Sequence, residues 1–251
     1  MRPPQKHKDF ARFSLFIFGV PHNILQENFN FRKQLQITTF GGPMKSKRVL
    51  FDITMSLQMY KQNAIGGLRI EREICKAVLK YADNVEFFAY DKNTDSLLAI
   101  SYNVGATVVG FDLADPNTKP PVAENEKMSF RDGDLIIAAG FVWEYNYFDK
   151  IKQLKTSIDL RLYGVVYDLI AVLFPEFMYK NYDKFKKYIY DLSDVADAIY
   201  CISESALNDL RQYLVDHNKF VPDLRRIGLG SEIVGPAADE RVAAPDAGAP
   251  A

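Results

Sequence analysis

The sequence predicts an α/β fold in which a Rossmann-like, mostly parallel sheet carries helices on both faces. Short apolar runs alternate with amphipathic segments along most of the chain. Glycine or polar turn residues separate these segments, as parallel α/β folds require. The 251 residues are 48% hydrophobic, which is enough to bury the core of one large domain.

The first strand and the first helix are joined through a pair of glycines. Residues 47–54 (K-R-V-L-F-D-I-T) are predicted to form a buried strand, and an amphipathic helix extends to about Ala82. Gly66 and Gly67 lie where the loop becomes the helix. Unpaired amides and the positive end of the helix dipole would therefore face outward without side chains in the way. This arrangement suits an anion, and phosphate best.

The later elements are expected to continue the alternation. Strands are predicted where apolar runs are bounded by turn residues: 85–90, 106–111, 132–140, 162–166 and a strand that begins at Ala198. Helices are predicted at 146–155, 182–193 and 205–215, the last with Ser205 as its N-cap. The continuous apolar run within 132–140 suits a strand covered on both faces.

Three loops are expected to meet at one edge of this sheet. Gly66 follows the first strand, Asp168 follows the strand at 162–166, and Ser203 follows the strand at Ala198. Because the C-terminal ends of parallel strands share an edge, these residues are predicted to line one ligand crevice.

Composition argues against several classes of function. A net charge of −1 gives no field that would recruit nucleic acid. Cys75 and Cys201 lack the C-x-x-C spacing of redox and zinc sites, so both are expected to be buried thiols in a reducing cytosol. The three histidines offer almost no candidates for a Ser/His/Asp triad or a histidine-bound metal. A histidine-bound metal centre is therefore not expected.

Three regions of the chain differ in composition. Residues 1–43 contain an apolar run too short to span a bilayer and show no clear period, and we interpret them as a misassigned or dispensable extension. Residues 44–232 carry the alternating strands and helices. Residues 233–251 are rich in Ala, Pro and Gly without apolar periodicity, which predicts a disordered tail.

Four motifs, in their order, resemble the N-terminal half of a family-four retaining glycosyltransferase. They are G-G-L-R-I-E-R-E, Y-D-L-I-A-V-L-F-P-E, C-I-S-E-S-A-L-N-D-L and R-R-I-G-L-G-S-E, and the resemblance extends over roughly residues 47–232. It implies a GT-B fold with two facing Rossmann-like domains. The N-terminal domain of that family mainly shapes the acceptor side, and the C-terminal domain holds the nucleotide sugar.

The resemblance also implies roles for individual residues. Those that would approach the donor diphosphate are Gly66, Gly67 and Arg69. Those that would contact the acceptor or the transferred sugar are Tyr167, Asp168, Glu176, Ser203 and Glu204. Tyr167 stands where the family commonly has histidine, so the catalytic residues stay unknown.

Plainer roles remain open for several of these side chains. Helix capping explains Ser203 and Glu204 almost as well, and Glu176 also fits a solvated loop carboxylate. Arg69 fits either a phosphate contact or a solvated helix face. Arg72, one turn further along, is interpreted as solvated and paired with a neighbouring glutamate.

The function implied by the resemblance is sugar transfer from a nucleotide sugar to a glycan or lipid-linked glycan. It requires no cofactor besides the nucleotide-sugar substrate. It implies no metal, because the family's two-domain fold neutralises the leaving diphosphate with helix ends and basic side chains. It also implies a cytoplasmic protein, at most peripherally bound to the inner face of a membrane. The paired glutamates that hold the donor in this family belong to its C-terminal half. The isolated chain is therefore expected to be inactive and to need a donor domain, which could be a separate chain.

Two other classes of function remain as alternatives. The chain could be a non-catalytic interaction module that retains the fold without the chemistry. It could also be an unrelated dinucleotide-binding protein, although G-G-L-R lacks the G-x-G-x-x-G spacing of that class.

Overall fold

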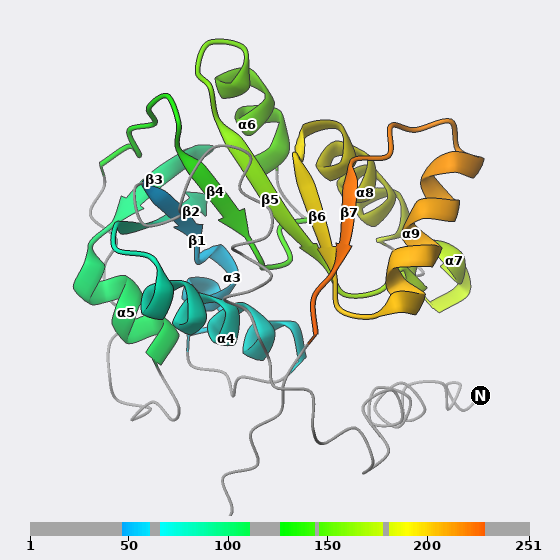
Figure 1. Ribbon diagram of the computed structural model, residues 1–251, viewed down its shortest axis with the longest axis horizontal. Helices are drawn as coiled ribbons and strands as arrows, with labels where there is room; N and C mark the ends of the chain where they lie inside the picture. Colours follow the sequence, from blue (N-terminus) through cyan, green and yellow to red (C-terminus); the bar gives the residue numbers. More distant parts are fainter. Residues whose placement is uncertain (1–46, 61–65, 111–125, 144–145, 178–180, 229–251) are drawn as a thin grey trace, which may run out of the picture. The chain divides into compact units, whose positions relative to one another are not determined.

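The computed structural model describes residues 47–60, 66–110, 126–143, 146–177 and 181–228. Within these residues a seven-stranded, mostly parallel sheet is flanked by helices (Figure 1). The predicted α/β fold class is therefore confirmed, and the arrangement is consistent with a Rossmann-like fold.

The strands lie in the order β3-β2-β1-β4-β5-β6-β7. Their bounds are β1 (Val49–Asp52), β2 (Val85–Asp91), β3 (Ser96–Ile100), β4 (Leu135–Ala138), β5 (Arg161–Val166), β6 (Ala198–Cys201) and β7 (Asp223–Arg226). Neighbouring strands are parallel except β2 and β3, which form an antiparallel pair. At the centre, Phe51 of β1 pairs with Phe87 of β2 and with Ile137 of β4.

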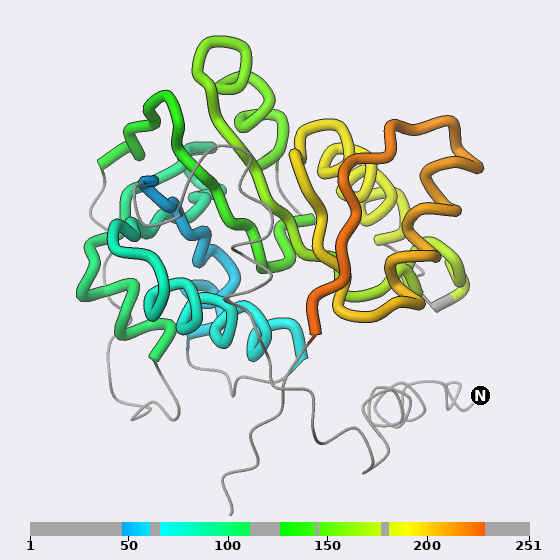
Figure 2. Tube along the Cα trace, viewed as in Figure 1, coloured from blue at the N-terminus to red at the C-terminus, as the bar shows by residue number. Residues whose placement is uncertain are grey.

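Different helices cover the two faces of the sheet (Figures 1 and 2). The helices are α3 (Thr54–Gln58), α4 (Gly66–Tyr81), α5 (Tyr102–Gly110), α6 (Tyr147–Lys155), α7 (Ile170–Leu173), α8 (Tyr182–Val195) and α9 (Glu204–Asp216), with the 3-10 turn η2 (Pro175–Phe177). Successive residues of a strand point to opposite faces. Val49 and Phe51 pack with residues of α4 and α5, whereas Leu50 packs with residues of α6, α8 and α9.

Most of the expected elements are present. The strands expected at 85–90, 132–140, 162–166 and from Ala198 correspond to β2, β4, β5 and β6, and the helices expected at 146–155, 182–193 and 205–215 correspond to α6, α8 and α9. Both β1 and β4 are buried along their whole length. Central parallel strands covered on both faces have this character.

The prediction of a strand at residues 106–111 is wrong. Up to Gly110 the segment belongs to α5, and Phe111 lies outside the described residues. Its β-branched and apolar residues favour a strand locally. However, Gly105, Val108 and Val109 recur at helical spacing and are buried, so packing on the sheet selects the helix.

The N-cap of α9 is Ser203 and not Ser205. The Oγ atom of Ser203 accepts a hydrogen bond from the Ala206 amide at 3.0 Å, and the helix begins at Glu204. Such a cap satisfies an amide that the helix itself leaves unpaired. The hydroxyl of Ser203 therefore has a structural partner.

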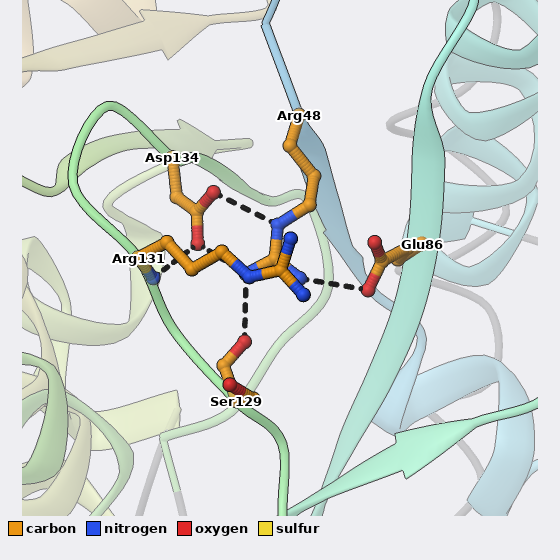
Figure 3. A network of polar contacts seen from close by, with 5 residues as sticks. All are labelled: Arg48, Glu86, Ser129, Arg131 and Asp134. Atoms are coloured by element: carbon orange, nitrogen blue, oxygen red, sulfur yellow. Dashed lines mark hydrogen bonds and ion pairs between the residues drawn. The ribbon is translucent and has the colours of Figure 1, made fainter.

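A buried ion-pair network holds the N-terminal ends of the central strands together (Figure 3). Arg48, directly before β1, donates from Nε at 2.9 Å and from Nη2 at 2.6 Å to the carboxylate of Asp134, directly before β4. Its Nη1 donates to Glu86 of β2 at 3.0 Å, and Nη2 also donates to the Ser129 carbonyl at 2.7 Å. These contacts join three strands at the edge opposite the predicted ligand loops.

Gly105 in α5 is expected not to tolerate a side chain. A Cβ atom there would lie 2.1 Å from Cδ2 of Phe87 in β2, so Gly105→Ala should lower the free energy of unfolding by roughly 1–3 kcal/mol. Gly110 ends the same helix and has nothing within 4 Å of its Cβ position, so Gly110→Ala is the matched control. Denaturant unfolding compares the two variants, and equal stabilities would contradict the described packing of α5 on β2.

Candidate functional site

The direction in which the chain crosses the sheet reverses at β1. From β1 the chain passes to β2 on one side, and it later returns to β4 on the other. Open α/β sheets bind ligands outside the C-terminal ends of their strands at such a switch point. The edge at which β1, β4, β5 and β6 end, called here the C-terminal edge, is therefore the candidate site.

The two glycines at the start of α4 have different structural reasons to be glycine. Gly66 has φ +53°, in the left-handed region that side chains disfavour, and no atom of another described segment lies within 4 Å of its Cβ position. A Cβ atom at Gly67 would instead lie 2.6 Å from Cε2 of Phe141, which follows β4, and 3.6 Å from Cζ of Tyr167. Gly66 is thus open around its Cβ position, while Gly67 lets two rings approach the helix.

Tyr167, which follows β5, contacts several segments at the C-terminal edge. Its hydroxyl donates to the carbonyl of Ala139, after β4, and lies 3.2 Å from the carbonyl of Gly67. Its ring packs on Phe141 with centroids 4.4 Å apart. Only 5% of Tyr167 is exposed, and burial holds the pKa of its hydroxyl well above the ordinary value. In this structure Tyr167 therefore joins three segments, and a direct sugar contact would require these hydrogen bonds to break.

The other predicted contact residues are more open. Val166 of β5 pairs with Cys201 of β6, so Asp168 and Ser203 follow neighbouring strand ends on the C-terminal edge. The side chains of Arg69, Asp168, Glu176 and Glu204 are exposed, and that of Ser203 is half-buried. Asp168 accepts a hydrogen bond from the Ile170 amide at 3.0 Å. Glu176 lies further along the chain, in η2.

Two carboxyl groups that the sequence did not single out are buried beside the glycine turn. Asp52 ends β1 and Glu71 lies in α4, with exposed fractions of 1% and 0%. One Asp52 oxygen accepts two hydrogen bonds from Thr54, one from its amide at 2.9 Å and one from its hydroxyl. The Thr54 hydroxyl oxygen in turn accepts a hydrogen bond from the Tyr90 amide at 2.8 Å. Glu71 Oε1 accepts from the Ser56 amide of α3 at 2.9 Å. Asp52 and Glu71 therefore satisfy amides in the first turn of α3.

Gly140, after β4, makes room for Glu71. A Cβ atom at Gly140 would lie 2.0 Å from Glu71 Oε2. Within the described residues, Glu71 Oε2 has no hydrogen-bond partner, whereas a hydrogen bond with the Tyr147 hydroxyl of α6 lowers the pKa of Asp52 in part. The buried carboxyl pair, Asp52 and Glu71, is thus enclosed by elements from both sides of the switch point.

The ionisation of this buried carboxyl pair is set by burial. Burial raises the pKa of Asp52 to about 6, although the Thr54 hydrogen bonds lower it in part. Burial first, and the charge of Asp52 second, raise the pKa of Glu71 to about 8. Glu71 therefore keeps its proton at neutral pH, and it places no negative charge behind the positive end of α4.

Sequence reasoning misses this pair because acidic side chains are usually exposed. A signal does exist, because Glu71 shares the buried face of α4 with Leu68, Cys75 and Val78 at helical spacing. The expectation that Arg72 is solvated is also wrong, since only 2% of it is exposed. Its charge lowers the pKa of Glu71 only partly.

No protein-family model matches the sequence, and no curated protein is significantly similar to it. Within the described residues, no group of three or more His, Cys, Asp or Glu side chains is arranged to hold a metal ion. None of the helices in the described part of the chain has the length and apolar character needed to cross a membrane. The roles expected for individual residues stay predictions.

Proposed function

We propose that the chain is the acceptor-side domain of a glycosyltransferase that moves a sugar from a nucleotide sugar to a glycan or lipid-linked glycan. The contact between Tyr167 and Gly67 carries this proposal. It brings the segment expected to bind phosphate and the segment expected to contact the sugar to one edge. That edge is also the switch point of the sheet, where α/β proteins bind ligands.

The start of α4 supplies the features that a diphosphate needs. The backbone at Gly66 is open around its Cβ position, and the helix has 16 residues whose dipole favours an anion at this end. Arg69 is exposed on the first turn and can add a charge-assisted hydrogen bond. In sugar transfer the acceptor hydroxyl oxygen forms a bond to the anomeric carbon while the bond from that carbon to the diphosphate oxygen breaks, and the hydroxyl proton leaves with the diphosphate. These groups would stabilise the negative charge that grows on the diphosphate.

The neighbouring strand ends supply groups suited to the acceptor. Asp168 and Glu204 are exposed carboxylates, and both follow strands that end on the C-terminal edge. Ionised carboxylates accept hydrogen bonds from sugar hydroxyls. The nucleotide itself would be held by a donor domain, as the resemblance implies, so binding to this chain alone is expected to be weak.

One observation favours a second function, that of a non-catalytic binding module. Tyr167 replaces the histidine common in the family, and its hydroxyl is buried against main-chain carbonyls. A group held in this way contributes to the architecture of the edge. The module would still bind a phosphorylated ligand at α4, but it would not transfer a sugar even with a donor domain.

The first test measures uridine diphosphate binding to the full chain. Arg69→Ala is expected to weaken binding by roughly tenfold, since a hydrogen bond between charged groups contributes about 1.5–3 kcal/mol. Lys80→Ala is the matched control, because it removes the same charge from the exposed face of the last turn of the same helix. Titration calorimetry gives both affinities. Equal losses in the two variants, or none in either, would contradict an anion site at the start of α4.

A further inference from the structure

The buried carboxyl pair is the most unusual polar feature of the C-terminal edge. Glu71 comes from α4 and its Oε1 accepts from the Ser56 amide of α3, while its Oε2 packs against Gly140 after β4. Asp52, at the end of β1, holds the turn that begins α3 through Thr54. Neither carboxyl group is used by the proposed ligand contacts, and neither reaches solvent.

We propose that Glu71 is a positioning residue that holds α3, α4 and the Gly140 segment together as an uncharged carboxylic acid, and that its ionisation loosens this edge and weakens anion binding there. The ligand part of this inference rests on the proposed function. The structural part does not, because it concerns only the protonation of Glu71 in the folded chain.

The proton belongs on Glu71 Oε2. The other oxygen, Oε1, already accepts from Ser56, whereas Oε2 has no partner within the described residues. Ionisation would leave a full charge in surroundings of low dielectric, and this penalty exceeds the stabilisation that Ser56 and Arg72 give the ionised form. The neutral acid avoids this cost while keeping the hydrogen bond to Ser56.

The charged and titratable neighbours of Glu71 come from each element packed on it. They are Asp52 of β1, Arg72 and Cys75 of α4, Tyr147 of α6 and Tyr167 after β5. Arg72 favours the ionised form of Glu71, and Asp52 opposes it. Burial raises the pKa values of Cys75, Tyr147 and Tyr167 further above their ordinary ranges. Burial and Asp52 outweigh Arg72, so the neutral acid is retained.

The direction of the pH effect follows from the two states of the chain. Unfolded Glu71 would titrate near 4.5, whereas the folded pKa is about 8. The contribution of the neutral acid to the free energy of unfolding is therefore fully present below pH 4.5, and it is lost as the pH rises toward 8. Asp52 acts in the same direction between pH 3.8 and about 6.

Glu71 also lies near the proposed anion site. It is five residues into the helix from Gly66, or roughly 7.5 Å along the axis. A new negative charge at that range would oppose a bound diphosphate and reduce its affinity on the order of tenfold. The second ionisation of a phosphate group lies near pH 6, so a comparison between pH 7 and pH 9 reports on the protein.

The test combines two measurements on the full chain and Glu71→Gln. Glutamine copies the shape of the neutral acid, so the variant should lose the fall in stability between pH 6 and pH 8, where Asp52 no longer contributes. At pH 8 its unfolding constant should be at least tenfold lower than that of the wild type. Its affinity for uridine diphosphate should stay constant from pH 7 to pH 9, while the wild type weakens about tenfold. Glu73→Gln, an exposed neighbour in α4, should behave like the wild type.

The outcomes separate the two proposals. A flattened stability profile without diphosphate binding at any pH would support the neutral Glu71 and overturn the proposed anion site. The same pH profile in wild type and Glu71→Gln would overturn the role of Glu71. If Glu71→Gln does not fold, a pH titration of the nuclear magnetic resonance shift of the Glu71 carboxyl carbon in the wild type decides between the outcomes. A titration midpoint near pH 8 supports the inference, and a midpoint near pH 4.5 overturns it.

Discussion

Arg48→Met is expected to lower the free energy of unfolding by roughly 3–5 kcal/mol, because it leaves the carboxylate of Asp134 buried without its partner. The two side chains are only 8% and 3% exposed, and two hydrogen bonds join them. Hydrogen bonding to Asp134 is also the main cause of the raised pKa of Arg48. Denaturant unfolding of the full chain measures the loss.

Two comparisons make this result specific to the buried pair. Lys76→Met removes an exposed charge that pairs with Glu73 on α4, and it should cost less than about 1 kcal/mol. The double variant Arg48→Met, Asp134→Leu should recover much of the loss, since no buried carboxylate is left without its arginine and Glu86 is 44% exposed. A double variant as unstable as the sum of the single changes would contradict the described network.

Gly140→Ala is expected to lower the free energy of unfolding by roughly 2–4 kcal/mol. The new methyl group would lie 2.0 Å from Glu71 Oε2 and 3.1 Å from Cβ of Met55, so Glu71 must leave its place. The Ser56 amide of α3 then loses its acceptor. Chemical denaturation measures the change, with Gly228→Ala as the control because nothing lies within 4 Å of its Cβ position.

A second substitution tests the stated cause. In a Glu71→Ala background, Gly140→Ala should cost clearly less, because the clash with the carboxyl group is absent. Contacting residues show such non-additive effects, whereas distant ones add. Additive costs in the double variant would show that Glu71 and Gly140 do not meet as described.

The fold could be predicted where the pattern is local. Apolar runs of the right length identify β1, β2, β4, β5 and β6, since buried parallel strands are apolar on both faces. The edge strand β7 (D-L-R-R) was missed for a physical reason, because its residues are charged and partly exposed, as those of solvated edge strands are. Helix α5 was mistaken for a strand because its close approach to Phe87 is a tertiary contact that no local pattern shows.

The candidate site was predictable only in part. Topology places Asp168 and Ser203 just beyond the ends of the neighbouring strands β5 and β6. Gly66 does not directly follow β1, because α3 lies between them, and it is the contact of Tyr167 with Gly67 that joins the start of α4 to the segment after β5. The buried state of Glu71 depends on Gly140, which is 69 residues away in the chain. The reason for glycine at position 67 likewise depends on Phe141. Neither contact can be predicted from the spacing of residues in the sequence or from its composition.

The proposed function depends on a diphosphate binding at the start of α4, beside Tyr167. The most direct measurement is an amide nuclear magnetic resonance titration of the isotope-labelled full chain with uridine diphosphate at pH 7. Saturable shifts are expected at the amides of Gly66, Gly67 and Leu68, with smaller shifts at Asp168. Shifts confined to other parts of the chain, or none at millimolar ligand, would contradict it.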